Sequence, residues 1–127
     1  MSEVVLDSSA LLAALHEEAG CEKVEPLLGA AAVSAVNWSE VVQKSLSRGV
    51  RLEGLRADME ALGLDIIPFT AEDAEIAADL WKKTHRRGLS LGDRSCLSLG
   101  IRLGLPVVTA DKAWKGLGAG IEIQVIR

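Results

Sequence analysis

Aromatic side chains are scarce in this sequence, which contains one Phe, no Tyr and three Trp among 127 residues. Hydrophobic residues nevertheless make up 49% of the chain, so the core must consist of Leu, Val, Ile and Ala rather than of stacked rings. A chain of this length can bury such a core as one compact unit. We therefore expect a single domain over residues 1–127, and an aliphatic core of this kind suits helices packed on a sheet.

Cysteine and long apolar runs are also in short supply. The two cysteines, Cys21 and Cys96, are too far apart to form a metal-binding or redox motif, which excludes a disulfide-rich scaffold and predicts a reducing compartment. No uninterrupted apolar run reaches the length of a membrane span, and the first residues carry acidic groups rather than a basic leader. We expect a cytoplasmic protein with no membrane association.

An excess of positive charge is missing as well, because the formal net charge is -4. Binding of nucleic acid through overall charge is thereby excluded, and contacts with phosphates need local basic clusters or a bound metal. Such clusters have two interpretations that the sequence leaves open: they guide an RNA backbone, or they are solvated cations at a helix end. The cations concerned are Lys82, Lys83, His85, Arg86, Arg87, Lys112 and Lys115.

Short apolar stretches alternate with amphipathic stretches of helical period along the chain. The strand-like stretches lack polar alternation, which is typical of strands buried on both faces. The pattern predicts an α/β fold with a mainly parallel central sheet and helices on both faces. Strands are expected at 4–6, 31–36, 65–69, 106–109 and 121–126, and helices at about 8–15, 22–28, 37–47, 51–62, 70–88 and 90–103.

Capping residues mark the expected helix starts. A short polar side chain before a helix accepts hydrogen bonds from backbone N–H groups that have no partner within the helix. An acid three residues further on completes a capping box. The expected caps are Ser8 or Ser9, Asn37, Thr70 with Asp73, and Ser90 with Asp93.

Four acidic residues occupy comparable places in this pattern. Asp7 and Asp111 follow strands, and Glu40 lies in the first turn of the helix after the second strand. Asp93 begins a helix that must run back toward the strand before Asp111. The carboxyl ends of parallel strands meet at one edge of a sheet, where open α/β folds bind ligands. We therefore expect all four carboxylates at that edge.

A purely structural explanation exists for two of these acids. Carboxylates at helix N-termini are stabilised by the helix dipole and by capping, and taken singly Glu40 and Asp93 are better explained in this way. Asp7 and Asp111 are different, because a charge at the end of a buried strand is costly unless a cation or a donor meets it. Two such residues in equivalent places indicate a shared cation.

The chemistry of an acidic cluster without His or Cys partners favours hard divalent ions. Mg²⁺ prefers carboxylate oxygens and retained waters, whereas zinc prefers nitrogen and sulfur ligands. A metal held at this edge lowers the pKa of a bound water, aims it at phosphorus and neutralises charge on the leaving oxygen. The cluster therefore predicts phosphoryl chemistry without a separate His base.

Four segments carry a resemblance to a known family. In chain order, VVLDSSALLA, SAVNWSEVV, LSLGDRSCLSLG and LPVVTADKAW resemble the signature blocks of the PIN-domain family, and together they span nearly the whole chain. The short single-domain form is most similar to the VapC-type toxins of type II toxin-antitoxin modules. The resemblance implies an α/β/α sandwich, endoribonuclease activity that depends on Mg²⁺ or Mn²⁺, an RNA substrate, a homodimer and inhibition by a cognate antitoxin.

The resemblance also implies roles for individual residues. Ser8 and Thr109 match hydroxyl-bearing neighbours of the family's acidic site. The acidic quartet itself, as metal ligands or as groups that orient the attacking water, corresponds to Asp7, Glu40, Asp93 and Asp111.

Two positions near the quartet are less regular. Asn37 occupies a polar position of the second block and shares a helical face with Glu40 and Lys44, so these three side chains are candidates for the rim of the site. Arg94 departs from the family pattern, which has a small residue directly after the third acid. Its local effect on the metal site is left open by the sequence.

The tryptophans are assigned from their neighbours. Trp38 and Trp81 lie among apolar residues at helical spacing, which predicts core or dimer contacts. Trp114 follows Asp111 by three residues and is the one candidate for stacking on RNA bases.

The residues around Asp7 disfavour two competing functions. A dinucleotide-binding enzyme needs a Gly-rich turn after the first strand, and the sequence there is DSSALLA. A phospho-accepting domain would use a second acid beside Asp7, which is missing. The remaining alternative is a PIN-like binding or scaffold module with little nuclease activity, although such a module is expected to lose part of the acidic set.

Overall fold

The central sheet has five strands, all parallel, in the computed structural model, which describes residues 1–127. The strand order is β3-β2-β1-β4-β5, so the chain reverses its direction of sheet growth between β3 and β4. The expected mainly parallel sheet is confirmed. The strands are β1 (Val4–Leu6), β2 (Ala31–Ser34), β3 (Asp65–Ile67), β4 (Val107–Thr109) and β5 (Ile123–Val125).

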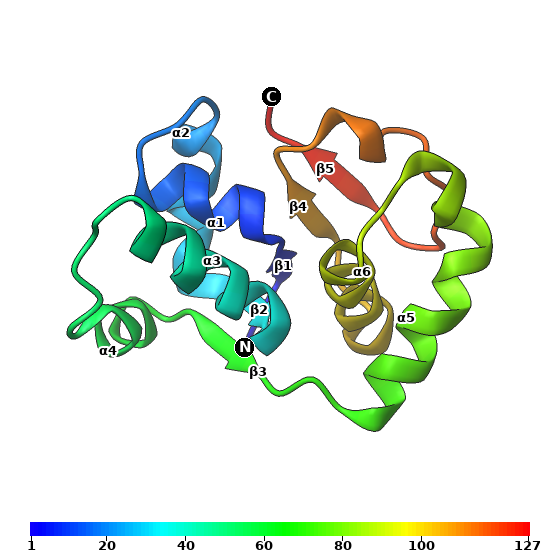
Figure 1. Ribbon diagram of the computed structural model, residues 1–127, viewed down its shortest axis with the longest axis horizontal. Coiled ribbons are helices and arrows are strands. Elements are labelled where there is room, and N and C mark those ends of the chain that lie inside the picture. Colours follow the sequence, from blue (N-terminus) through cyan, green and yellow to red (C-terminus); the bar gives the residue numbers. More distant parts are fainter.

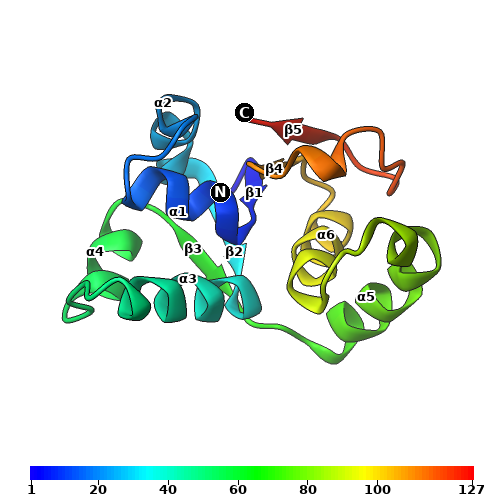
Figure 2. The same ribbon diagram turned by 45° about the horizontal axis from the view of Figure 1, so that its top comes forward.

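Helices cover both faces of this sheet. Figures 1 and 2 show α1 to α4 gathered on one side and α5 with α6 on the other. None of the helices combines the length and the apolar character needed to cross a bilayer. They are α1 (Ser8–Leu15), α2 (Cys21–Val24), α3 (Ala35–Ser47), α4 (Leu55–Ala61), α5 (Ala71–Thr84) and α6 (Leu91–Leu103), with the 3₁₀ helices η1 (Glu25–Ala30), η2 (His85–Arg87) and η3 (Lys112–Trp114).

The core consists of two apolar clusters, one on each face of the sheet. Val4 and Leu6 of β1 pack in the cluster that contains residues of α1 to α4, whereas Val5 packs in the cluster that contains residues of α5 and α6. This division follows from the strand geometry, because successive side chains point to opposite faces. The three-layer α/β/α arrangement is confirmed.

Two helix caps differ from the expected ones. Asp7, and neither Ser8 nor Ser9, caps α1, because its Oδ1 accepts a hydrogen bond from the backbone N–H of Ala10 at 2.9 Å. Ser34 takes the place expected for Asn37 at the start of α3. The expected strand over 31–36 thus ends two residues early. Both predicted capping boxes, at the starts of α5 and α6, are present.

The helix expected over 51–62 is shorter than predicted and begins at Leu55. Its N-cap, Gly54, has φ of 77°, a left-handed conformation that favours glycine and that an ongoing helix cannot contain. The preceding residues, 51–53, lie outside the helix.

Candidate active site

The parallel topology places all four predicted acids at the carboxyl edge of the sheet. Asp7 directly follows β1, and Asp111 lies two residues beyond β4. Asp93 is the third residue of α6, while Glu40 lies in the second turn of α3 and not in the first as expected. The negative charge of Asp93 reaches Asp7, and those of Glu40 and Asp111 reach Asp93, so the four carboxylates form one electrostatic cluster.

Asp7 is the buried centre of this group, with 4% of its surface exposed. Besides the N–H of Ala10, it accepts hydrogen bonds from the hydroxyls of Thr109 at 2.7 Å and Ser9 at 2.8 Å. Burial raises the pKa of Asp7 to about 6, against the opposing effect of these three hydrogen bonds, and the charge of Asp93 raises it further. Burial therefore disfavours the ionised form of Asp7, whereas the three hydrogen bonds favour it.

Asp93 combines a structural role with a half-buried place in the cluster. Its carboxylate accepts a hydrogen bond from the backbone N–H of Ser90 at 2.9 Å and completes the capping box of α6. Burial raises the pKa of Asp93, the bonds to Ser90 lower it, and the charges of Glu40 and Asp111 raise it again. The structural explanation and the charge cluster therefore both apply to this residue.

Glu40 is held by a small network that joins three helices. Its Oε1 accepts hydrogen bonds from the hydroxyl of Ser8 in α1 at 2.6 Å and from Nδ2 of Asn37 at 3.0 Å. The same Nδ2 donates to the backbone carbonyl of Gly92 in α6 at 3.0 Å. The expected partnership of Asn37 and Glu40 is present, whereas Lys44 forms no ion pair with Glu40.

The Glu40 side chain occupies space that is available only because residue 92 is a glycine. A Cβ atom at this position would lie 2.6 Å from Oε1 of Glu40. We expect Gly92→Ala to keep the fold, because alanine favours a helix over glycine, and to push the Glu40 carboxylate away from Ser8 and Asn37. A displacement of this size in a catalytic group lowers turnover by about 100-fold.

Cleavage kinetics together with thermal melting check this expectation. An alanine variant that cleaves RNA as fast as wild type would show that the position of Glu40 is unimportant. A variant that melts well below wild type would assign the lost activity to misfolding.

Ser9 and Thr109 connect the ends of β1 and β4. The Oγ1 atom of Thr109 donates to Asp7 and accepts from the N–H of Asp111 at 3.0 Å. Ser9 likewise donates to Asp7 and accepts from the N–H of Ala110 at 2.9 Å. The sequence pointed to Thr109 but assigned Ser9 no role beyond that of a candidate cap. A hydroxyl two residues after a strand-ending acid is the signal that could have identified it.

No cation of the chain neutralises the four acids. All five ion pairs of the structure involve other carboxylates, so Asp7 is a buried acid without a counter-charge. No three His, Cys, Asp or Glu side chains stand close enough together to hold a metal ion as they are placed. The donor set itself, carboxylates beside hydroxyls, fits a hard divalent ion, and bringing such an ion to the edge would remove the mutual repulsion.

The tryptophans lie differently from the prediction. Trp114 is fully buried in the cluster that contains residues of α6, so its expected stacking on RNA is wrong. Trp81, expected in core or dimer contacts, is 53% exposed and is therefore not a core residue. Trp38 is half-buried against the other cluster, as predicted. Trp114 lies in the short helix η3 and points inward. This orientation depends on packing between elements rather than on the local sequence pattern.

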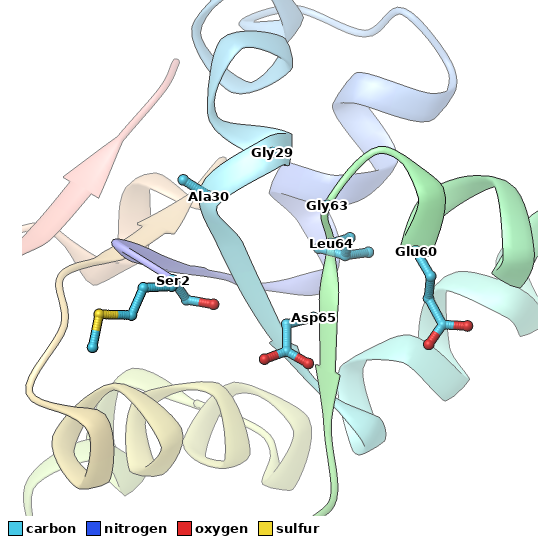
Figure 3. Close-up of a pocket in the computed structure, with 8 residues that line it drawn as sticks. Ser2, Gly29, Ala30, Glu60, Gly63, Leu64 and Asp65 are labelled. Atoms are coloured by element: carbon cyan, nitrogen blue, oxygen red, sulfur yellow. The ribbon is translucent and has the colours of Figure 1, made fainter.

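A distinct pocket lies away from the acids. Figure 3 shows it where β2 and β3 begin, with Glu60 and Asp65 at its wall. Its volume is about 330 Å³. None of the pockets of the structure includes any of the four acids, so the acidic edge is an open surface rather than an enclosed cavity.

An all-parallel α/β/α sandwich with acids at its carboxyl edge defines a class of open α/β domains with a ligand site where the strand order reverses. Within this class, the model of the PIN domain family matches residues 4–119, and the chain belongs to that family. No curated protein matches the chain in sequence.

Solved structures of similar fold cover the whole chain. The toxin VapC20 of Mycobacterium tuberculosis, which cleaves the sarcin-ricin loop, matches with a TM-score of 0.75 and 16% identity over 98% of this chain and 100% of its own. A toxin-antitoxin complex from Klebsiella pneumoniae matches with a TM-score of 0.74 and 18% identity over 98% of both chains. The DNA-bound VapBC complex of Salmonella typhimurium matches with a TM-score of 0.74 and 15% identity over 100% of both chains.

Proposed function

We propose that the protein is a metal-dependent endoribonuclease and the toxin of a type II toxin-antitoxin system. One observation carries the proposal: Asp7 is buried beside Asp93, and no cation of the chain balances either charge. An uncompensated buried acid is costly, and such groups cluster at functional sites. Membership in the PIN domain family supports the same conclusion.

The four acids have distinct places in the proposed reaction. Asp7, Asp93, Asp111 and Glu40 would hold Mg²⁺, for which Mn²⁺ can substitute. When bound, the ion supplies an activated water and neutralises charge on the phosphate. Thr109 and Ser9 orient the Asp7 carboxylate through their hydroxyls. Oε2 of Glu40 accepts no hydrogen bond, which leaves this oxygen available to the ion or to orient the attacking water.

The proposed partners follow from the same assignment. The substrate is RNA, the protein acts in the cytoplasm as a homodimer, and a cognate antitoxin blocks the site. Two of the similar structures are toxin-antitoxin or VapBC complexes, and a third is a toxin that cleaves the sarcin-ricin loop, which supports an antitoxin partner and an RNA substrate. A basic side chain of an antitoxin would form charge-assisted hydrogen bonds with the acids in place of the metal.

Cleavage of RNA in the presence of Mg²⁺ or Mn²⁺, and its absence in EDTA, is the expected result for the purified protein. Metal is required because no cation of the chain pairs with the four acids, and without a cation they would repel the phosphate of the substrate. The assay follows a labelled RNA on denaturing gels, with metal added back after EDTA treatment as the control.

A second function is open to the same fold. A PIN-like scaffold module with little nuclease activity would leave the RNA intact at every metal concentration. Metal-independent cleavage would instead contradict the proposed chemistry.

A further inference from the structure

An exposed aromatic pair lies at the end of α5. The rings of Trp81 and His85 stack with centroids 4.2 Å apart and planes inclined by 17°. Nδ1 of His85 lies 2.8 Å from the backbone carbonyl of Trp81, which fixes the imidazole ring. Trp81 is nevertheless 53% exposed. A large aromatic ring that is held in place yet open to solvent is prepared to stack on another planar group.

This pair lies at the end of α5 from which the chain leads through η2 into α6 and Asp93. Nη1 of Arg94 donates to the backbone carbonyl of Ala77 at 2.8 Å and thereby fixes the first turn of α6 against α5. Trp81 lies one helical turn beyond Ala77, in the direction of the loop that leads to Ser90 and Asp93. Because Arg94 contacts Ala77 and Arg102 contacts Asp73, the two helices run antiparallel, and Trp81 lies toward the same end of the pair as the start of α6.

Arg87 joins the basic end of α5 to the loop that follows Asp111. Its guanidinium donates to the backbone carbonyls of Ala113, Lys115 and Gly116, at 3.2, 2.7 and 3.2 Å. Arg87 itself is therefore engaged in a structural contact. The contact brings η2, with Arg86, and the segment that includes Lys112 and Lys115 to one surface.

Several cations of this surface have no acidic partner. Lys82 pairs with Asp79 at 3.1 Å, but the remaining ion pairs of the structure lie elsewhere. All of the unpaired side chains are exposed. They are Arg86, Lys112 and Lys115.

We propose that Trp81 and His85 form a stacking platform for an unpaired base of the RNA substrate, and that the unpaired cations hold the adjoining phosphates. This inference rests on the proposed ribonuclease function and adds the place where substrate binds. Aromatic rings flanked by cations are the common means of holding single-stranded nucleic acid. The platform binds the strand beside the acids, so the phosphate to be cut lies within a few nucleotides of the stacked base.

A protein partner is the competing occupant, because exposed tryptophan and arginine are also frequent in protein interfaces. The charge pattern favours RNA. The exposed cations of η2 and of the segment that Arg87 contacts have no acidic partner, and each would lose its hydration in a protein interface unless the partner supplied a matching acid. A phosphate backbone supplies a regular series of such charges.

Binding of a fluorescein-labelled oligoadenylate in EDTA, followed by anisotropy, tests the platform without catalysis. Trp81→Ala should weaken binding by about 5- to 100-fold, as expected for the loss of one stacked base. Trp81→Phe should retain most of the affinity, because a ring remains. An abasic oligomer of the same length should bind wild type and Trp81→Ala equally, because it offers phosphates and no bases.

Matched controls lie on α4, which Figures 1 and 2 place on the opposite side of the molecule from α5. Leu62, which follows α4, is as exposed as Trp81, and Arg56 is an exposed cation of α4. Leu62→Ala and Arg56→Gln should bind oligoadenylate as wild type does. Lys115→Gln and Arg86→Gln should each reduce the slope of log affinity against log salt by about 0.7.

The results separate this proposal from the nuclease assignment. Binding through Trp81 by a protein that cleaves no RNA would support the platform and contradict the nuclease. Normal cleavage and binding by Trp81→Ala would contradict the platform and leave the nuclease intact. A change of oligomeric state in Trp81→Ala on gel filtration, with unchanged RNA affinity, would show that a second protein chain covers the rings and would overturn the platform.

Discussion

Replacement of Asp7 by Asn should raise the melting temperature of the metal-free protein at neutral pH by roughly 10 °C. The pKa of Asp7 is about 6 in the fold against an ordinary value of 3.8. Ionising this carboxyl at neutral pH therefore costs the folded state about 3 kcal/mol. The neutral amide avoids this cost.

The hydrogen bonds around Asp7 can be kept when Asp7 is replaced by Asn. Asparagine caps helices as well as aspartate does, so the introduced oxygen can accept the N–H of Ala10. The hydroxyls of Ser9 and Thr109 can rotate to accept from the introduced amide group. The same variant should be inactive, because it removes a proposed metal ligand.

The stability of the folded protein should depend on pH in a direction set by the raised pKa of Asp7. A raised carboxyl pKa contributes stability that is complete below a pH of about 4 and is lost as the pH rises through about 6. In EDTA, wild type should therefore weaken between these values, whereas Asp7→Asn should not share this loss. Added Mg²⁺ should stabilise wild type more than the variant. A variant that melts below wild type in EDTA and keeps the full Mg²⁺ shift would show that Asp7 serves the fold alone.

Asp93→Asn should reduce RNA cleavage by at least about 100-fold while the protein stays folded. The introduced amide oxygen can still accept the N–H of Ser90, so the capping box of α6 survives. What the substitution removes is the charge that faces Glu40, Asp111 and Asp7. The measurement is the initial rate of cleavage in saturating Mg²⁺.

Asp73→Asn is the matched control for this experiment. Asp73 has the same place in the capping box of α5 that Asp93 has in α6. Burial opposes its ionisation, but hydrogen bonds and charge from Arg102 hold the pKa of Asp73 below its usual value. Arg102 lies nine residues after Asp93, about 14 Å further along α6.

The control should lose stability and keep activity. Without the charge that pairs with Arg102, Asp73→Asn should melt below wild type, yet it should cleave RNA at the wild-type rate well below its melting temperature. Equal loss of activity in the two variants would show that capping, and not the metal, explains the effect of Asp93.

The predictable parts of the structure are those that depend on local pattern. Short apolar runs identified all five strands and the parallel sheet, although only β1, β2 and β4 are fully buried and the edge strands β3 and β5 are partly exposed. The acids after β1 and β4 were identifiable for the same reason, because a charge at the end of a buried strand stands out against its neighbours. Once the sheet is parallel, its topology brings these acids to one edge without further information from the sequence.

The caps were not predictable, because the competing residues are adjacent. Asp7, Ser8 and Ser9 are all good caps, and the choice depends on where β1 ends. Pairing decides this, since the N–H of Asp7 still donates to the carbonyl of Val108 in the neighbouring strand. A contact between residues about a hundred positions apart therefore sets a feature that looks local.

The exposure of individual side chains could not be predicted from the sequence either. Trp81 and Trp114 both follow apolar or small neighbours, yet one is 53% exposed and the other is fully buried. Gly92 carried no signal either, because its importance comes from a Glu40 side chain that reaches it from another helix. Such features follow from packing between elements rather than from the pattern within one.

Mn²⁺ binding, measured by calorimetric titration of the metal-free protein, tests the central assignment most directly, because it reports on the acidic edge without requiring the right RNA. We predict saturable binding by wild type and by Asp73→Asn, and loss of that binding in Asp93→Asn and Asp7→Asn. Wild-type affinity in Asp93→Asn, or no binding by wild type, would contradict the assignment of these four acids as a metal site.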